Sequence, residues 1–218
     1  MNIPILFQDA RFVVLNKPAG LPVHPGRAGG PSVEDCFPQL SRRADGPWLA
    51  HRLDTDTAGC LVVALRKAAL LAAQAEFAGG RAEKTYWAVV RGGPAADAGT
   101  IDAPLAKHIQ GRQWRMAVDP VGQPAVTDWR VRGRADGIAW LELRPHTGRT
   151  HQIRAHCAHL GCAILGDPVY GDGRGPLHLL ARDIRLGGSA ALAATAPPPA
   201  HMQAALRQCG WDGVMFPQ

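Results

Sequence analysis

The chain has 218 residues, of which 46% are hydrophobic and 19% are charged, enough for one well-formed core but not for two large domains. It contains no charge-free apolar stretch of about 18 residues, and its N-terminus lacks the basic-then-apolar pattern of a secretory signal, so we expect a soluble cytoplasmic protein. The formal charge of +6 is compatible with a polyanionic partner without establishing one.

The five cysteines are odd in number and include no Cys-x-x-Cys pair, which argues against a disulfide framework. We expect them to be buried or half-buried thiols in a reducing compartment.

The N-terminal third of the chain predicts short strands and loops. Leu6–Phe7 and Phe12–Asn16 are expected as strands around the turn Asp9–Arg11. Residues 26–46, rich in Gly, Pro and Ser, predict a surface excursion with one helical turn over Val33–Phe37.

The middle of the chain carries stronger patterns. The continuous apolar run Cys60–Leu65 predicts a strand buried on both faces, and the periodicity of Lys67–Ala78 predicts a helix that ends at the following glycine. Another strand is expected over Thr85–Val90. Val126–Val131 and Ile138–Leu143, joined through an Ala-Asp-Gly turn, predict a hairpin.

In the second strand of that hairpin, Ala139, Leu141 and Leu143 alternate with Trp140, Glu142 and Arg144, as expected for a half-buried strand. A helix over Thr150–Leu160 should end at Gly161, and a short last helix should follow Pro197–Pro199. Because strands and helices mix without strict alternation or repeats, the predicted class is α+β with a largely antiparallel sheet, in a single domain over residues 1–218.

Two segments contain several residues that could take part in catalysis or binding. The first, His51–Gly59, places Asp54 just before the predicted buried strand, where one end of a loop is rigidly held. Its structural alternative is a surface turn capped by Asp54. The second, Gly148–His156, opens a helix on which Arg154 could pair with a carboxylate from elsewhere and keep it ionised. Its alternative is a solvated basic face.

Two other groups of residues have plain structural alternatives. Tyr86, within Lys84–Ala88, by itself indicates an aromatic residue at the edge of the core. A cluster of histidines and cysteines superficially resembles a zinc site. However, Cys157 falls on the apolar stripe of the predicted helix, and His151 and His156 lie more than a turn apart. We therefore expect no metal site, and a zinc-dependent hydrolase remains an alternative function.

Taken together, these segments resemble the RluA-type pseudouridine synthase family. The motifs that carry the resemblance occur in the family's order and span roughly residues 6–184. They are Asn16–His24, His51–Asp54 with Thr57 and Gly59, Lys84–Ala88, Gly148–Arg154 with His156, and Leu160–Gly161 followed by Gly166–Gly171. The resemblance implies a mixed, mostly antiparallel sheet that is flanked by helices and split by an RNA-binding cleft.

The resemblance also implies a role for each matching residue. Asp54 matches the catalytic aspartate, and Arg154 matches the arginine that pairs with it. Arg52 matches the arginine that helps to occupy the space left by the flipped nucleotide. Tyr86 matches the aromatic residue that packs on the target base, and Ile153 forms part of the apolar wall beside them.

The implied reaction converts uridine to pseudouridine without a cofactor or a metal. It breaks the bond between ribose and N1 of uracil, rotates the base and rejoins it through C5, so the nucleotide must first be extruded into a pocket. The carboxylate attacks the sugar or removes a sugar proton, and the sequence does not separate these routes. An aromatic face holds the detached base by stacking while it rotates.

The chain departs from the family pattern at Ala58, where serine is usual, and at Leu179-Leu180-Ala181, where Leu-His-Ala is common. Neither departure touches the proposed catalytic set. Many relatives carry an N-terminal S4 RNA-binding domain, whereas this chain begins at the catalytic core, so we expect the core itself to hold the RNA. The candidate contacts, each with a solvated surface as its alternative, are Lys107, His108, Arg112, Arg115, Arg149 and Arg174.

The expected substrate is a structured RNA, namely tRNA, a stem-loop of 23S-type rRNA, or both, and the expected working form is a monomer without an obligate protein partner. The competing hypothesis is a non-catalytic RNA-binding or RNA-folding protein on the same scaffold. Such a protein would not need Asp54, Arg154 and Tyr86 together.

Overall fold

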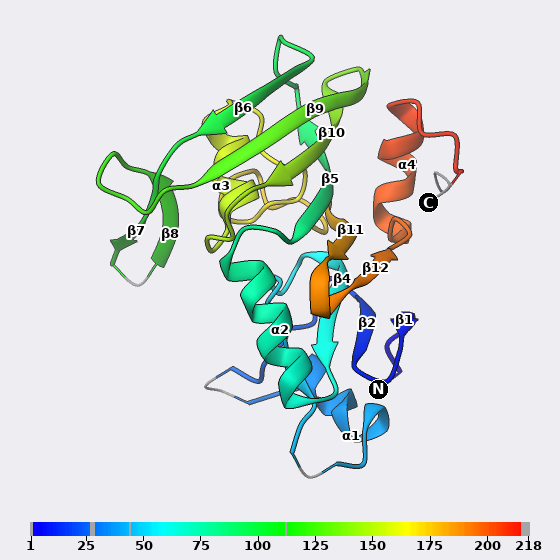
Figure 1. Cartoon of the computed structure of the whole chain (residues 1–218). Helices are drawn as coiled ribbons and strands as arrows, with labels where there is room; N and C mark the ends of the chain where they lie inside the picture. The colour runs from blue at the N-terminus through cyan, green and yellow to red at the C-terminus, as the bar shows by residue number, and fades with distance from the viewer. Residues whose placement is uncertain (1, 27–28, 44, 112, 215–218) are drawn as a thin grey trace. The chain divides into compact units, whose positions relative to one another are not determined.

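A computed structural model describes residues 2–26, 29–43, 45–111 and 113–214 (Figure 1). The contacts divide the chain into two compact units, the first of Met1–Lys84 with Leu180–Pro198, the second of Thr85–Leu179 with Pro199–Gln218. The single catalytic domain expected over residues 1–218 stays a prediction. Among the described residues, no helix is both long and apolar enough to cross a membrane.

The first unit is built on adjacent strands with one continuously buried member. The strands lie in the order β1 (Ile5–Gln8), β2 (Phe12–Lys17), β4 (Ala58–Ala64) and β11 (Leu179–Leu186), with β3 (Trp48–Leu49) on β4 and β12 (Leu192–Thr195) on β11. The β2–β4 pair is antiparallel and the β4–β11 pair is parallel. Every residue of β4 is buried, which confirms the prediction from its apolar run.

The first unit contains one long helix, which the sequence predicts, and short helical turns, of which only the turn near Val33–Phe37 is predicted. Helix α2 spans Lys67–Ala78, as expected, and buries Ala69, Leu70 and Ala73. The excursion holds a 3-10 turn η1 (Val33–Cys36) and the single-turn helix α1 (Phe37–Leu40). A second 3-10 turn, η2 (Gly188–Ala190), precedes β12.

The second unit contains an antiparallel array and a separate hairpin. The array runs in the order β5 (Glu83–Arg91), β10 (Ile138–Pro145), β9 (Val126–Ala135) and β6 (Ala98–Asp102). The predicted β9–β10 hairpin is confirmed, although β9 continues four residues beyond its expected end. The separate hairpin joins β7 (Leu105–Gln110) and β8 (Gln113–Val118).

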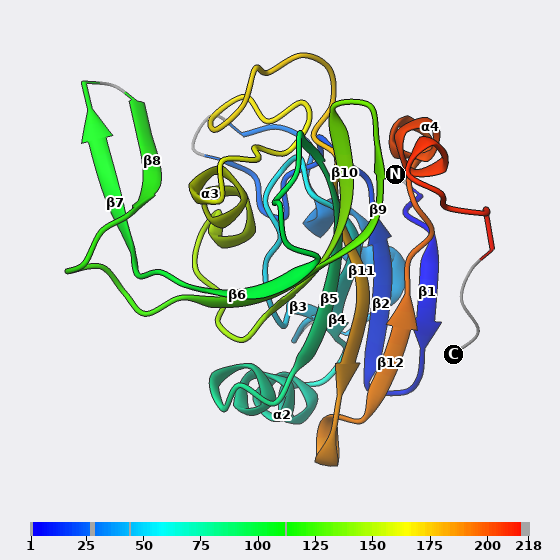
Figure 2. The same ribbon diagram turned by 90° about the horizontal axis from the view of Figure 1, so that it is seen from above.

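Two helices cover opposite faces of this array, as both ribbon views show (Figures 1 and 2). Helix α3 (Gln152–His159) packs Ile153 and Cys157 into a cluster with Leu141 and Leu143 of β10. Helix α4 (Ala200–Gln208) buries Met202 and Leu206. Helix α3 starts two residues later than predicted, because His151 adopts a left-handed conformation.

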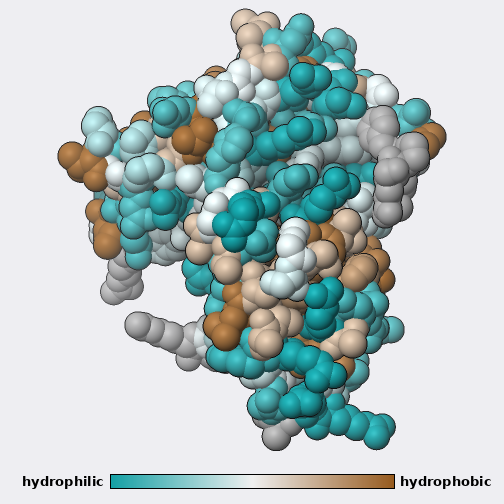
Figure 3. Space-filling model, viewed as in Figure 1, coloured by the Kyte–Doolittle hydropathy of each residue, from teal (hydrophilic) through white to brown (hydrophobic). Residues whose placement is uncertain are grey.

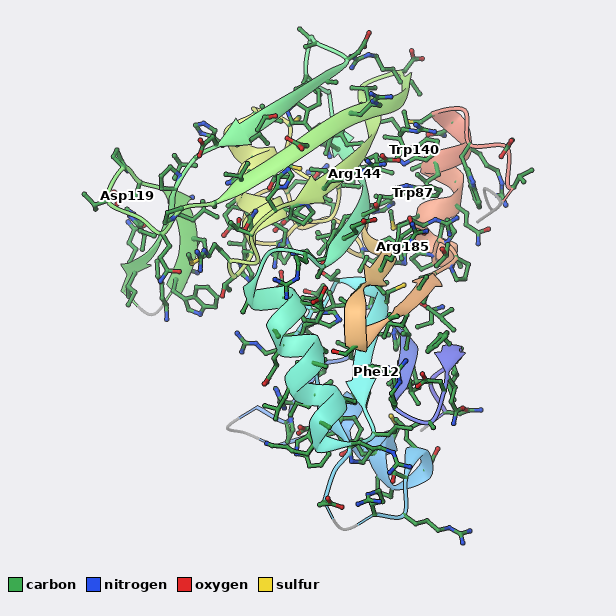
Figure 4. The ribbon with its side chains drawn as sticks, in the orientation of Figure 1. Phe12, Trp87, Asp119, Trp140, Arg144 and Arg185 are labelled. Carbon is green, nitrogen blue, oxygen red and sulfur yellow. The ribbon has the colours of Figure 1, made fainter. Side chains whose placement is uncertain are left out.

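The helix α4 explains why Trp140 departs from the expected alternation of β10. Trp140 was expected on the solvated side of the strand but is only 3% exposed, and it meets Trp87 of β5 edge to face at 4.7 Å (Figure 4). Close approach of the C-terminal end of α4 requires Gly133, since a Cβ atom there would lie 1.7 Å from the Cys209 carbonyl oxygen.

Away from α4, the same face of the β9–β10 pair is polar. Asp128 accepts hydrogen bonds from Thr100 and pairs with His146, and Arg144 pairs with Glu142. The upper part of Figure 3, where β6, β9 and β10 face the viewer, is correspondingly hydrophilic. This part of the face is therefore a solvated surface with paired charges.

All five cysteines are free and buried, which confirms that prediction. Burial raises the pKa of each thiol, to about 12 for Cys60 and to about 11 for Cys162. Three of the cysteines belong to the second unit, and Cys36 and Cys60 belong to the first.

The parallel contact of β4 with β11 depends on a glycine. Gly59 has a φ of +110°, and a Cβ atom there would lie 2.2 Å from the carbonyl oxygen of Ala181, its partner in the register. A side chain would thus meet both backbone strain and a backbone atom that cannot rotate away.

We expect Gly59→Ala to lower the free energy of unfolding by about 2–4 kcal/mol, because it combines both penalties. Urea unfolding followed by circular dichroism measures this change. Gly26→Ala is the matched control, since Gly26 has open space around its Cβ position and no positive φ. Equal unfolding midpoints for the two variants would contradict the argument.

A histidine side chain continues the pairing of β3 with β4. The Ala50 N–H donates to the Val62 carbonyl, and the Val62 N–H donates to Nε2 of His51 at 3.0 Å. The ring of His51 also contacts Phe77 of α2, with centroids 4.9 Å apart. Burial, with a smaller contribution from the charge of Lys84, lowers the pKa of His51 from 6.5 to about 4.

This shift makes stability depend on pH in the acidic range. Between 6.5 and about 4 the unfolded chain protonates His51 whereas the folded protein does not, so its contribution is complete above 6.5 and is lost as the pH falls. The loss amounts to about 3 kcal/mol at most.

We expect His51→Gln to reduce the acid dependence of the unfolding free energy, because the glutamine amide oxygen still accepts from Val62 and does not titrate. Urea unfolding at neutral pH and at a pH of about 5 tests this in both proteins. An identical fall in stability for wild type and variant would refute it.

Candidate active site

A buried lysine fixes the loop that carries Asp54. Lys17, at the end of β2, is 0% exposed, and its ammonium donates to the carbonyls of Pro18, Leu21 and Thr55 at 2.7–2.9 Å. The Gly20 N–H donates to the same Thr55 carbonyl at 3.0 Å. Thr55, the residue after Asp54, is thus held both by the last residue of β2 and by the loop that follows β2.

The charge on Lys17 is also part of the electrostatic environment of this loop. Burial lowers the pKa of Lys17 to about 8, and the carboxylates of Asp56 and Asp54 oppose that shift. Three carbonyl acceptors match the three N–H bonds of a protonated ammonium, so the geometry fits the charged form. A buried cation therefore lies beside the candidate catalytic carboxylate.

The loop itself is a tight turn leading into β4. The Thr57 N–H donates to the backbone carbonyl of Asp54 at 3.1 Å. Leu53 and Thr57 are buried, Asp54 is half-buried, and Arg52 is exposed. Both flanking residues therefore anchor Asp54, while the side chain of Arg52 points to solvent.

A buried amide network fixes the start of α3 in the second unit. The side-chain oxygen of Gln152 accepts from the Thr147 hydroxyl at 2.7 Å and from the Arg149 N–H at 2.9 Å. Its NH₂ group donates to the carbonyl of Val126 and the hydroxyl of Thr127. The helix that carries Ile153 and Arg154 is consequently locked to β9.

Arg154 is held by a carboxylate that the sequence analysis did not assign. Its guanidinium donates two hydrogen bonds of 2.8 Å to the two oxygens of Asp167, and both side chains are almost fully buried. Burial alone would raise the pKa of Asp167, but hydrogen bonds from Arg154 and from the backbone of Val169 and Tyr170 hold it below its usual range. The solvated-face alternative for Arg154 is wrong, because this residue is only 3% exposed.

Tyr86 and Ile153 belong to one apolar cluster in the second unit. Ile153 is 6% exposed within the cluster, and Tyr86 packs against it while partly exposed. Tyr86 is thus an aromatic residue at the edge of a core, as the structural alternative held.

The candidate RNA contacts do not share one surface. In the β7–β8 register Lys107 lies opposite Met116 and His108 opposite Arg115, so Lys107 and Arg115 project from opposite faces of the hairpin. Figure 4 shows Asp119 beside this hairpin, and its carboxylate pairs with His108 at 3.0 Å.

Two of the remaining candidates are exposed arginines. The exposed Arg149 donates to the Pro124 carbonyl at 3.0 Å, and Arg174 is also exposed. Arg112 lies outside the described residues. The solvated-surface alternative therefore stays open for each of the exposed arginines.

In the group of histidines and cysteines, His156 and Cys157 make hydrogen bonds and packing contacts that stabilise the fold. Nε2 of His156 donates to the Ala103 carbonyl and Nδ1 accepts from the Thr127 hydroxyl. Cys157 is buried in the core cluster, where burial raises its pKa well above the usual value. These contacts leave the ring nitrogens of His156 without a lone pair directed at a metal.

Lys17 and Asp167 are therefore site residues that were not predicted from the sequence. Both stand inside motifs that carry the family resemblance, Asn16–His24 and Gly166–Gly171. A charged residue within a predominantly apolar or glycine-rich motif was the available signal, but its partners lie far along the chain. Lys17 reaches Thr55, and Asp167 reaches back to Arg154.

Comparison with known proteins agrees with the resemblance. A family model described as RNA pseudouridylate synthase matches residues 11–159. An uncharacterized RNA pseudouridine synthase of Synechocystis is 40% identical over 165 residues, which cover 70% of this chain and 50% of that protein. The ribosomal large subunit pseudouridine synthase D of Zymomonas mobilis is 37% identical over 161 residues, covering 69% of this chain and 50% of that protein.

Structural comparison leads to the same group of proteins. The solved structure of human RNA pseudouridylate synthase domain containing 4 superposes with a TM-score of 0.80 and 30% identity, covering 94% of this chain and 92% of that one. This likeness confirms the predicted α+β class with its mostly antiparallel strands. The chain spans about half the length of the two bacterial relatives. It belongs to the RNA pseudouridylate synthase family, and within it to the RluA type.

Proposed function

We propose that this protein isomerises specific uridines of structured RNA to pseudouridine, with Asp54 as the catalytic carboxylate. The observation that supports this most directly is the rigid turn around Asp54, tied through Thr55 to the buried ammonium of Lys17. A reactive group gains from being held in one geometry, because its orientation entropy is lost before the reaction begins. The family membership supplies the class of reaction.

The other proposed site residues supply what the reaction needs besides a carboxylate. Tyr86, which is partly buried at the edge of the core, stacks on the uracil and tolerates its rotation. Ile153 contributes apolar wall, and Arg154 provides a positive charge for the anionic groups of the site. The exposed Arg52 occupies the space that the extruded nucleotide leaves in the RNA.

The proposed substrates are tRNA, large-subunit rRNA stem-loops, or both. One relative is named a ribosomal large subunit pseudouridine synthase, which supports the rRNA option. Lys107, Arg115 and Arg149 are the proposed phosphate contacts, and all three are exposed. We place the enzyme in the cytoplasm as a monomer, where its buried thiols stay reduced.

Replacing Asp54 by Asn should reduce kcat by about a thousandfold or more, because the amide neither attacks the sugar nor accepts its proton. Release of tritium from C5-labelled uridine in RNA transcripts measures the reaction, since the new bond forms at C5. Asp56→Asn is the matched control, because it removes the neighbouring carboxylate two residues away. A comparable loss in both variants, or none in Asp54→Asn, would count against the proposal.

A map of pseudouridine sites in cells that lack the protein, complemented with wild type or Asp54→Asn, identifies the substrate. Sites that return only with wild type name the RNA. A variant that restores every cellular effect without restoring modification would favour the non-catalytic alternative instead.

Asp167→Asn should impair both stability and turnover. It removes the negative charge from a buried, doubly hydrogen-bonded ion pair, which costs about 3 kcal/mol or more. A displaced Arg154 lowers kcat by about a hundredfold. Asp172→Asn is the control, since it breaks the solvent-exposed pair with Arg91 and should leave stability nearly unchanged. Wild-type stability in Asp167→Asn would disprove the importance of this pair.

A further inference from the structure

The β7–β8 hairpin needs support that its own pairing does not provide. An isolated two-stranded hairpin is at best marginally stable in water. At its base, Leu105 is fully buried in a small cluster with Ala125 and Ala155. Farther out, the strand residues are mostly exposed, and Figure 2 shows the hairpin extending away from β6 and β9, on the side where α3 lies. Its outer half must therefore be held by contacts with the rest of the second unit.

The stack of Trp114 on His151 is such a contact. The two rings are 5.0 Å apart and inclined by 27°, so they lie nearly parallel. The ammonium of Lys107, which projects from the same face of the hairpin as Trp114, lies 4.9 Å from the centre of the indole. One imidazole thus supports the face of the hairpin that presents Lys107.

The backbone of His151 is adapted to this stack. Its φ is 52°, and among the described residues it is the one non-glycine residue with a positive φ. Left-handed backbone costs free energy for any residue with a Cβ atom and persists where surrounding contacts enforce it. With His151 in this conformation α3 begins at Gln152, and the His151 ring lies against Trp114 of the hairpin.

A tyrosine makes a second link between the same residues. The Met116 N–H of β8 donates to the Tyr170 hydroxyl at 3.0 Å, and that hydroxyl lies 3.3 Å from Nδ1 of His151. A hydroxyl that accepts from an amide still has its own hydrogen to donate to Nδ1. The hairpin is therefore attached to His151 through Trp114 directly and through Tyr170 indirectly.

We propose that His151 is a positioning residue that holds the β7–β8 hairpin in the orientation in which its Lys107 face binds the RNA substrate. This inference rests on the proposed function for its RNA, but not for the attachment of the hairpin. In this role His151 acts on the hairpin and takes no part in the chemical step. Its removal should weaken RNA binding and leave the chemical step intact.

The Met116 amide reports the attachment without any RNA. Because this amide donates to Tyr170 and not across the hairpin, its hydrogen exchange slows only when the hairpin is docked. We expect about tenfold faster exchange in His151→Asn, which tolerates left-handed backbone but loses the ring. His159→Asn, an exposed histidine at the other end of α3, is the matched control and should exchange like wild type.

A second variant removes the stack from the other side. Trp114 is 43% exposed, so Trp114→Ala is expected to fold even if His151→Asn does not. It should also speed Met116 exchange, and the double variant should exchange no faster than the faster single one, since both remove the same contact. Unchanged exchange in both single variants, or independent additive effects, would overturn the proposal.

The kinetic test separates positioning from catalysis. For the transcript that the wild-type protein modifies, His151→Asn should raise KM about tenfold and change kcat by less than about twofold. A fall in kcat at unchanged KM would assign His151 to the chemical step, and unchanged values of both would deny the hairpin a role in RNA binding. Either result overturns the proposal.

The proposed function can fail separately. If the wild-type protein modifies neither unmodified tRNA transcripts nor large-subunit rRNA stem-loops, the isomerase proposal fails before any variant is compared. The dissociation constants of the same transcripts then replace KM. A rise of about tenfold in His151→Asn supports the positioning role, and equal values overturn it.

Discussion

Taking an ammonium group out of water is costly unless each of its hydrogens finds an acceptor. In the first unit that condition fixes the local structure around the candidate catalytic residue, because the acceptors for Lys17 are backbone carbonyls from two loops. Moving either loop would leave a buried charge unsatisfied. The turn at Asp54 is therefore rigid as a consequence of desolvation, and the doubly buried strand β4 anchors its other end.

The second unit solves a similar problem with a pair of opposite charges. Arg154 and Asp167 satisfy each other, and backbone N–H groups complete the coordination of the carboxylate. Such a pair contributes little net stability but strongly favours one arrangement of the groups around it. The Gln152 network and the left-handed His151 add to that effect at the start of α3. The site residues of this unit consequently share one well-defined scaffold.

The parts of the fold that local patterns determine could be predicted from the sequence. Helix α2 has the predicted bounds, and β4 and the β9–β10 hairpin lie where the apolar runs and the Ala-Asp-Gly turn indicate. The strand β11 was missed, because Arg182, Asp183 and Arg185 interrupt its apolar pattern. The buried guanidinium of Arg182 donates to the Ala196 carbonyl, a partner that no local pattern reveals.

The hairpin β7–β8 was missed for a different reason. Seven of the twelve residues in its two strands are exposed, and apolar and polar residues do not alternate along Leu105–Gln110, so the pattern that marks a strand is weak. The candidate site shows the same division. Motifs identified Asp54 and Arg154, whereas their supports, Lys17 and Asp167, depend on contacts that close only in the folded chain. The start of α3 was misplaced because a helical pattern does not show that His151 turns left-handed.

The burial of every cysteine has a practical consequence. Because a thiol reacts as its thiolate, a raised pKa and a closed environment together make each of these groups slow to alkylate or oxidise in the native protein. Reaction then requires that the surrounding structure open. Cys36 and Cys60 respond to opening of the first unit, and Cys157, Cys162 and Cys209 to opening of the second. The rates at which the cysteines of the wild-type protein react thus report separately on opening of the first unit and of the second unit.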